Sequence, residues 1–156
     1  MMFLGLDCSS LAIHGALLDD KEQVVTLYKW GSSQKDFTNR FTEISVGYSE
    51  ELSKIELIDV AAIEAAIFIQ NPKTTIAIAN VIGAAWAFLL ARNIPTVIID
   101  NRQWKKLIVG KGNASKEDIK NFAIDKWGEI FPEQDYADAA CIALWNKRRF
   151  DNGWRT

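Results

Sequence analysis

The stretch Met2-Phe3-Leu4-Gly5-Leu6-Asp7 is a short apolar run that ends in a carboxylate. A second run of the same design, Val60-Ala61-Ala62-Ile63-Glu64, ends in a glutamate. Short and nearly continuous apolar runs predict buried β-strands. A carboxylate at the end of such a strand is costly to desolvate unless it has a partner or a metal ion. The two runs therefore predict a buried sheet with two acids at one edge.

Two further carboxylates, Asp135 and Asp138, stand three residues apart at the head of the helical segment 139–145. This spacing puts both on one face of a helix. Taken singly, each acid could be structural, since aspartate is common in turns, at helix N-caps and in first helical turns. Taken together, four acids would repel one another unless divalent cations lay between them. Carboxylate oxygen is the ligand that Mg²⁺ and Mn²⁺ prefer, so the set predicts a site for such cations.

The first part of the chain predicts an antiparallel meander followed by a helix. Strands are expected at 3–7, 13–18 and 24–30, and the connection at 19–21 is short enough for a hairpin. Apolar residues then recur every three or four positions over 37–55, which predicts a helix with one apolar stripe. The next strand begins at Leu57 and ends at Glu64.

The remaining elements complete an α/β domain with a mixed sheet. A long helix is expected from Pro72 to about Arg92, with Asn71 as its N-cap. A fifth strand follows at 95–99, and a helix opens at Ser115 and ends near Gly128. The last helix starts near Asp135 or Tyr136, which gives the order β-β-β-α-β-α-β-α-α.

Length and composition indicate one soluble domain. The 156 residues, 49% hydrophobic and 24% charged, suit a single domain over 1–156, with a flexible C-terminal tail from about residue 147. We expect no membrane partner, on the interpretation that no uncharged apolar run approaches ~18 residues. Asp7 interrupts the apolar start, so no signal peptide is expected. The two cysteines, Cys8 and Cys141, are expected to be buried thiols in a reducing compartment.

The net charge of −2 argues against a generally basic nucleic-acid coat. Residues 101–116 nevertheless contain five basic side chains and no acidic one: Arg102, Lys105, Lys106, Lys111 and Lys116. Basic strips beside an acidic centre suit an enzyme that grips phosphates and cuts beside one of them. The commoner alternative is a solvated charged face.

The histidine and the tryptophans are weaker candidates for functional residues. His14 is the single histidine, and we expect a half-buried strand residue there rather than a general base. Trp104 and Trp154 are candidates for stacking on bases. Most of the six tryptophans are nevertheless expected to pack in the core.

The succession of strand-Asp, strand-Glu and a late helix opening on Asp-x-x-Asp resembles the ribonuclease-H-like nucleases, and more closely the bacterial RuvC-type Holliday-junction resolvases. The match runs from about Phe3 to Leu144. It rests on these segments: Phe3-Leu4-Gly5-Leu6-Asp7, Ala62-Ile63-Glu64, Arg102-Gln103-Trp104-Lys105, Gly110-Lys111-Gly112-Asn113-Ala114-Ser115-Lys116 and Asp135-Tyr136-Ala137-Asp138-Ala139-Ala140. The resemblance implies a ribonuclease-H-like, mixed five-stranded sheet flanked by helices.

The resemblance also implies residue roles. It makes Asp7, Glu64, Asp135 and Asp138 the metal ligands, for two Mg²⁺ ions per active site with Mn²⁺ as a substitute. It places Lys116 at the scissile phosphate as a catalytic residue. It makes the following residues DNA contacts: Arg102, Lys105, Lys106, Lys111, Lys116, Lys73 and Phe68.

The sequence departs from the family in three places. Cys8-Ser9-Ser10 replaces a Pro-Gly-like turn after Asp7. Three residues after Glu64, where the family tends to have an aromatic, the chain has Ile67, and Phe68 follows. The position of Asp135 is histidine in some relatives.

The chemistry implied is hydrolysis of a phosphodiester. It needs an in-line water, neutralisation of phosphate charge and help for the departing 3′ oxygen, and two cations about 4 Å apart supply all three. Asp7, central on the first strand, is best placed to bridge them. Lys116, at the start of a helix, is placed to stabilise developing phosphate charge.

The leading hypothesis is a Mg²⁺-dependent endonuclease that resolves four-way DNA junctions by symmetric paired nicks, in the cytoplasm of a bacterial or phage-infected cell. The apolar surplus of helix 72–92 predicts a homodimer, whose two-fold symmetry matches that of the junction. One alternative is a monomeric ribonuclease-H-like nuclease acting on RNA or an RNA–DNA hybrid. Others are a non-catalytic nucleic-acid binder and an ATP-binding fold of the kinase type.

Overall fold

One mixed sheet lies at the centre of the computed structural model, which describes residues 1–66 and 71–153. Its strands are β1 (Phe3–Cys8), β2 (Ala12–Leu18), β3 (Val24–Gly31), β4 (Val60–Glu64) and β5 (Thr96–Ile99). They lie in the order β3-β2-β1-β4-β5. The strands β1 to β3 form the predicted antiparallel meander, and β4 and β5 run parallel to β1.

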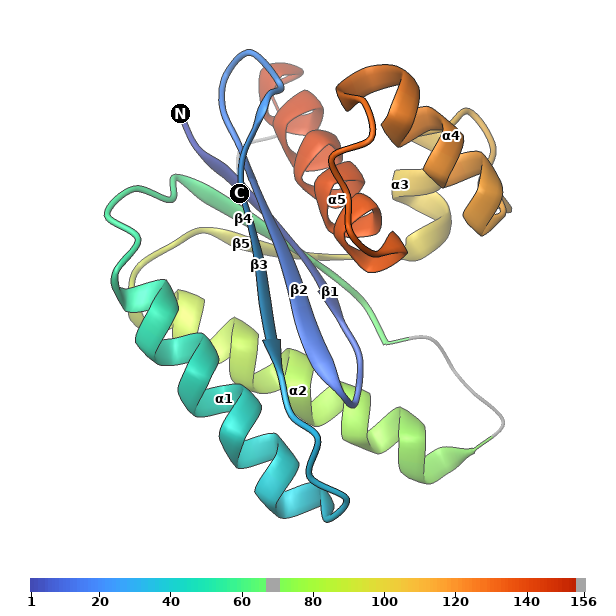
Figure 1. Cartoon of the computed structure of the whole chain (residues 1–156). Coiled ribbons are helices and arrows are strands. Elements are labelled where there is room, and N and C mark those ends of the chain that lie inside the picture. Colours follow the sequence, from blue (N-terminus) through green and yellow to red (C-terminus); the bar gives the residue numbers. More distant parts are fainter. Residues whose placement is uncertain (67–70, 154–156) are drawn as a thin grey trace.

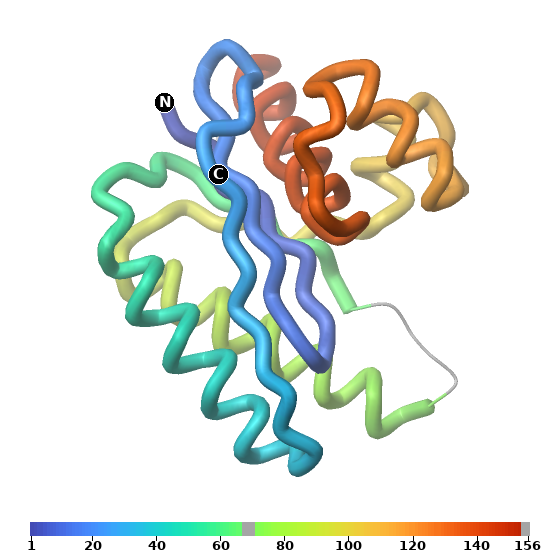
Figure 2. The backbone as a smooth tube through the Cα atoms, in the orientation of Figure 1, coloured from blue at the N-terminus to red at the C-terminus, as the bar shows by residue number. Residues whose placement is uncertain are grey.

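Helices cover both faces of the sheet (Figures 1 and 2). They are α1 (Phe37–Ser53), α2 (Pro72–Ala91), α3 (Asn101–Ile108), α4 (Lys116–Trp127) and α5 (Gln134–Asp151). The pair α1 and α2 lies on one face, and α5 lies on the other with α3 and α4 beside it. This is the α/β, ribonuclease-H-like arrangement that the resemblance implies.

Strand alternation decides which side chains meet α5. In β1, Leu4 and Leu6 belong to the core beneath α1 and α2, so Gly5 and Asp7 point to the opposite face. A Cβ on Gly5 would lie 2.2 Å from the carbonyl oxygen of Ala139 and 2.3 Å from the amide nitrogen of Ala143, both in α5. Gly5 therefore lets α5 lie directly against β1, two residues from Asp7.

Most predicted elements are confirmed to within a few residues, including the Asn71 N-cap and the Ser115–Asp118 capping box. The helix α3 was missed. It begins after Asp100, whose side chain accepts from the amide of Arg102. No helix is predicted from the sequence over 101–108, although the apolar residues Trp104 and Ile108 are four apart and both buried.

The C-terminal helix is longer than predicted. It continues through residue 147, where a flexible tail was expected, to Asp151. Lys147 is buried and forms an ion pair with Asp151, and Arg148 bonds to Glu22. These contacts hold the last turns of α5 in place.

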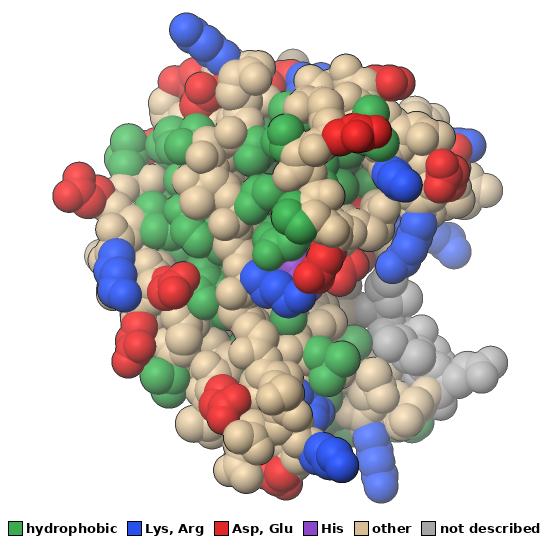
Figure 3. Space-filling model, in the orientation of Figure 1, with side chains coloured by type: hydrophobic (Ala, Val, Ile, Leu, Met, Phe, Trp, Pro, Cys, Tyr) green, Lys and Arg blue, Asp and Glu red, His purple; other side chains and the backbone are tan. Residues whose placement is uncertain are grey.

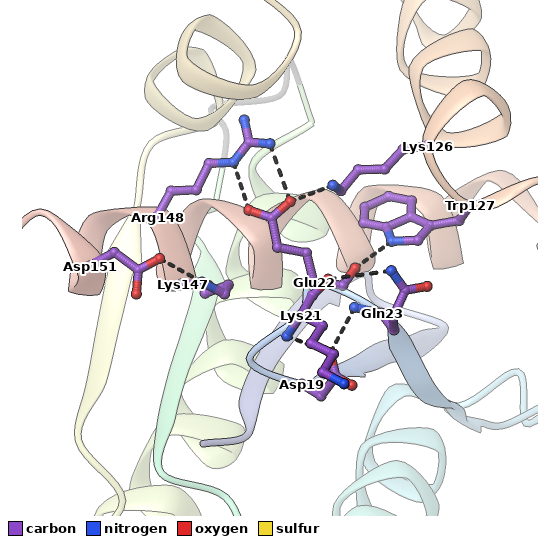
Figure 4. Close-up of polar contacts among 9 residues, drawn as sticks. All are labelled: Asp19, Lys21, Glu22, Gln23, Lys126, Trp127, Lys147, Arg148 and Asp151. Atoms are coloured by element: carbon purple, nitrogen blue, oxygen red, sulfur yellow. Dashed lines mark hydrogen bonds and ion pairs between the residues drawn. The ribbon is translucent and has the colours of Figure 1, made fainter.

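Glu22 fastens the β2–β3 hairpin to two helices (Figure 4). Its carboxylate accepts from Lys126 of α4 and Arg148 of α5, while its carbonyl oxygen accepts from the indole of Trp127 at 2.7 Å. The neighbouring Asp19 closes the turn by accepting from the amides of Lys21 and Gln23. The hairpin therefore helps to fix α4 and α5 relative to the sheet.

The helix α2 corrects one sequence expectation. Residues 74–91 carry no charge, and the helix is long and apolar enough to cross a membrane by length and composition alone. One side of it packs into the core through Val81, Ala85 and Leu89. A core helix of a soluble protein passes the same test, so this finding is weak evidence for a span.

Candidate active site

The acids at the strand ends meet at one edge of the sheet. The strands β1 and β4 are parallel, and Leu6 pairs with Ile63. Asp7 and Glu64 are the next residues of these two strands, so they come at the same level of the sheet. Both point to the face covered by α5. The first two turns of α5 supply Asp135 and Asp138, and carboxylate oxygens of Asp7, Asp135 and Asp138 all lie within 4.8 Å of one another.

Burial and repulsion from neighbouring carboxylates disfavour the charged forms of Asp7, Glu64 and Asp138. The pKa of Asp7 is raised well above its usual value, chiefly by burial and then by the charges of Glu64, Asp138 and Asp135. Burial likewise raises the pKa values of Glu64 and Asp138. Carboxylates held together at this cost fit bound divalent cations, which favour the ionised forms and take oxygen ligands. The donor set therefore fits the metal that the sequence predicts.

Glu64 is oriented by a tryptophan that sequence reasoning took for a stacking or packing residue. The buried indole of Trp104 donates to Glu64 Oε2 at 2.5 Å. This hydrogen bond lowers the pKa of Glu64 against the larger effect of burial. The sequence signal for a packed Trp104 is its place four residues after Asp100, a residue type common at helix N-caps. The other stacking candidate, Trp154, lies outside the described residues.

Two lysines act on the acids electrostatically. The charge of Lys116, the first residue of α4, opposes the pKa increase of both Asp7 and Asp138. The charge of Lys105 does the same for Glu64 and Asp138, and its ammonium lies 5.5 Å from the centre of the Trp104 ring. The charges of both lysines, one from α3 and one from α4, therefore favour the ionised forms of these acids.

The other predicted DNA contacts are not gathered at the acids. Lys111 forms a 2.9 Å ion pair with Asp118, which, with hydrogen bonds from Ser115, holds the pKa of that carboxyl at about 2. Arg102 and Lys106 are exposed on α3, and Lys73 is exposed at the start of α2. Phe68 lies outside the described residues, as does Ile67.

His14 is closer to the acids than the sequence suggested. It is buried, not half-buried, with 4% of its surface exposed. In Figure 3 only a small area in the histidine colour is visible, next to basic (blue) and acidic (red) side chains. Its Nε2 lies 3.2 Å from Glu133 Oε2, and its Nδ1 lies 3.8 Å from Asp135 Oδ2. The ring also meets the edge of Tyr136 at 4.9 Å between centroids.

The two thiols have different settings. Cys8 is partly buried beside Asp7, Cys141 is buried within α5, and both are free. Burial raises the pKa of each thiol. The prediction of a buried thiol is therefore confirmed for Cys141, whereas Cys8 is only partly buried.

Comparison with known proteins gives a consistent result. The family profile described as "Crossover junction endodeoxyribonuclease RuvC" matches residues 11–145. A relative of that name from Neisseria meningitidis serogroup C is 33% identical over 85 residues, which cover 54% of this chain and 48% of the relative. The chain thus matches about half the length of this relative. Another from Oleidesulfovibrio alaskensis is 28% identical over 153 residues, covering 94% of this chain and 91% of the relative.

Solved structures support the fold. The Thermus thermophilus RuvC in complex with a Holliday junction substrate superimposes with a TM-score of 0.84 at 19% identity, covering 98% of this chain and 96% of that one. The yeast mitochondrial Holliday junction resolvase gives a TM-score of 0.57 at 15% identity, over 93% of this chain and 78% of that one. At these identities the likeness concerns the fold.

Proposed function

Because the chain belongs to the RuvC family of crossover junction endodeoxyribonucleases, we propose that it is a structure-selective DNA endonuclease. Its substrate is the four-way junction, which it resolves by symmetric paired nicks through hydrolysis of phosphodiester bonds. The observation that carries the proposal is the meeting of Asp7, Asp135 and Asp138 within 4.8 Å, with Glu64 on the adjacent strand. Burial and mutual repulsion make acids this close together costly, whereas a cation-dependent nuclease requires them.

Each acid has a role in holding divalent cations. Burial and the charges of the other three acids all disfavour ionisation of Asp7, so a divalent cation at this centre would be held by Asp7 together with those acids. Glu64 completes one side of the site and the Asp135–Asp138 pair completes the other. Two Mg²⁺ ions, with Mn²⁺ as a substitute, supply charge neutralisation at the scissile phosphate and activation of water when bound.

Lys116 and Lys105 have different proposed roles in binding phosphate. The charge of Lys116 acts on Asp7 and Asp138, which supports a position near the scissile phosphate, where its ammonium would stabilise developing charge. Lys105 faces Glu64 from α3 and binds the adjoining DNA backbone. Weaker backbone contacts come from these residues: Arg102, Lys106, Lys111 and Lys73. Phe68 is proposed as a contact near the junction centre.

The active unit is a homodimer that associates through α2. This helix exposes Ile76, Trp86 and Leu90, at 61%, 41% and 51% of their surface, on the side away from the sheet. Exposed apolar side chains on one helix support a protein partner, and a two-fold partner presents two active sites to the two strands of a symmetric junction. The enzyme acts where the DNA is, in the cytoplasm of a bacterium or phage-infected cell.

A gel assay tests the proposal. Purified protein is incubated with a labelled synthetic four-way junction and Mg²⁺, in parallel with a linear duplex and an RNA–DNA hybrid of the same sequence. The proposal predicts a pair of nicks at symmetry-related positions in the junction and little cleavage of the controls. Preferential cleavage of the hybrid would instead support the ribonuclease-H-like alternative.

A further inference from the structure

His14 occupies a position beside the central acid of the site. It pairs with Asp7 across the antiparallel ladder of β1 and β2, and directly opposed residues project to the same face of a sheet. That face is the one covered by α5. An imidazole at this position therefore shares the polar edge with the acids and is not part of the apolar core.

One ring nitrogen of His14 has a fixed partner. Its Nε2 lies 3.2 Å from Glu133 Oε2, and the same carboxylate is held by Lys29 at 2.7 and 2.8 Å. Lys29 is the cross-strand neighbour of His14, and Glu133 makes no side-chain cap to α5. A carboxylate can only accept, so Nε2 carries the proton and, in the neutral ring, Nδ1 keeps its lone pair.

The other ring nitrogen faces Asp135. Nδ1 lies 3.8 Å from Asp135 Oδ2, which is too far for a hydrogen bond, and it has no hydrogen-bond partner in the described ranges. Two atoms each about 2.1–2.2 Å from one ion, at about 90–120° to each other, lie about 3.0–3.8 Å apart. The observed pair is therefore close to the separation of two ligands of one cation.

Asp135 belongs to two groups of potential ligands. One joins it to Asp7 and Asp138, and the other joins it to His14 and Glu133. An open pocket of about 630 Å³, lined in part by His14, Lys29 and Asp135, gives a hydrated ion access to this point. Lys29 neutralises Glu133. The donors that remain available to a cation here are therefore the oxygens of Asp135 and Nδ1 of His14.

We infer that His14 is a further metal ligand, which binds through Nδ1 a divalent cation shared with Asp135. The arrangement of Glu133 behind the ring is the carboxylate–histidine–metal pattern that fixes a ligating imidazole. A nitrogen donor added to a carboxylate centre favours Mn²⁺ over Mg²⁺, since imidazole suits transition metals better than Mg²⁺. The inference rests on the proposed function only for the presence of a cation at this centre.

Pulsed electron paramagnetic resonance with Mn²⁺ tests this ligation without DNA. The wild-type chain, free of any histidine tag, is loaded with less than one equivalent of Mn²⁺, and nitrogen coupling to the ion is recorded. His14 is the only histidine, so selective ¹⁵N-histidine labelling marks this ring alone. The expected result is a directly bound imidazole signal that changes from ¹⁴N to ¹⁵N with the label. An ion with oxygen ligands only would overturn the inference, and this outcome needs no variant.

Two substitutions extend the test. His14→Gln should lose the nitrogen coupling and weaken Mn²⁺ binding by about tenfold, at the lower end of the effect of altering ligand surroundings, with a much smaller change for Mg²⁺. Glu133→Gln keeps an acceptor for Nε2–H and should retain the coupling. Equal weakening for both ions in His14→Gln, without prior coupling in the wild type, would show that His14 only positions Asp135.

The inference and the proposed function can fail separately. A chain that shows imidazole coupling but cleaves no junction retains the metal ligand and loses the nuclease assignment. A chain that cleaves junctions but shows no imidazole coupling retains the nuclease and loses the ligand.

Discussion

The indole N–H of Trp104 donates to Glu64 Oε2 at 2.5 Å, joining a buried residue of α3 to a predicted metal ligand at the end of β4. The bond favours the ionised carboxylate and so opposes the effect of burial on its pKa. A helix that was not predicted from sequence therefore helps to keep one acid of the site ready to bind a cation.

Trp104→Phe removes this bond and should raise the pKa of Glu64. A hydrogen bond to a charged group contributes about 1.5 kcal/mol, or about one pKa unit. The acidic limb of the pH–rate profile should therefore move upward, with cleavage reduced about tenfold on that limb and much less at higher pH. The matched control is Trp30→Phe, which also loses a bond from a buried indole to a carboxylate, that of Glu51 on α1, and should keep the wild-type profile. An unchanged profile in Trp104→Phe would separate Trp104 from the site.

Gly5→Ala should displace α5 from β1, because the new Cβ would lie within 2.3 Å of backbone atoms of Ala139 and Ala143. Overpacking of this kind costs about 1–3 kcal/mol, and the shift moves Asp135 and Asp138 away from Asp7. The temperature of thermal unfolding and the rate of junction cleavage should both fall. Gly47→Ala on α1, where the nearest atom to a new Cβ lies 4.0 Å away in Trp30, should instead add about 0.5–1 kcal/mol of stability. Full activity in Gly5→Ala would contradict the close packing described for β1 and α5.

Lys105→Ala and Lys116→Ala should have different effects. Loss of Lys105, a proposed backbone contact, should weaken junction binding and lower the salt dependence of binding by about one unit. Loss of Lys116 should lower turnover at saturating DNA with little change in affinity. Lys54→Ala, at the end of α1 on the opposite face, is the control. Equal loss of affinity in both variants with unchanged turnover would contradict the role given to Lys116.

Trp86→Glu should convert the proposed dimer into a folded monomer, because this side chain is exposed on the outer face of α2. Ile82, a neighbouring candidate in sequence, is 8% exposed and packs in the core, so a charge there would damage the fold. Leu57→Glu, also exposed but outside α2, is the matched control. Sedimentation decides: a wild type of 17.6 kDa at micromolar concentration would exclude the dimer.

The sequence was sufficient for the strands, because their apolar runs and turns are local signals. It also predicted that Asp7, Asp135 and Asp138 meet, with Glu64 at the end of the strand parallel to that of Asp7. It did not predict α3, because the helix is short and its only helical signal is the spacing of two apolar residues, Trp104 and Ile108, among basic ones. Nor did it reveal that His14 faces Asp135, because that contact depends on strand pairing and on how α5 docks, neither of which a single side chain encodes.

The raised pKa of Asp7 implies a stability effect with a definite sign. The folded, metal-free protein holds the Asp7 proton more tightly than the unfolded chain does, so this residue costs stability as pH rises from its ordinary pKa through the raised one. At neutral pH without metal, Asp7→Asn should therefore have a free energy of unfolding about 0.5–2 kcal/mol larger than that of wild type, and it should unfold at a higher temperature. Saturating Mg²⁺ should reduce or reverse the difference, since the wild type binds the ion better.

The most direct test compares Asp7→Asn with wild type on a synthetic four-way junction in Mg²⁺, with cleavage and binding measured on the same preparations. The proposed metal centre predicts that cleavage is abolished while junction binding is equal or tighter, because the variant keeps the shape and the basic surface and loses only the ligand charge. Cleavage within about tenfold of wild type, a change in barrier of only ~1.4 kcal/mol, would remove Asp7 from the metal site and contradict the nuclease mechanism.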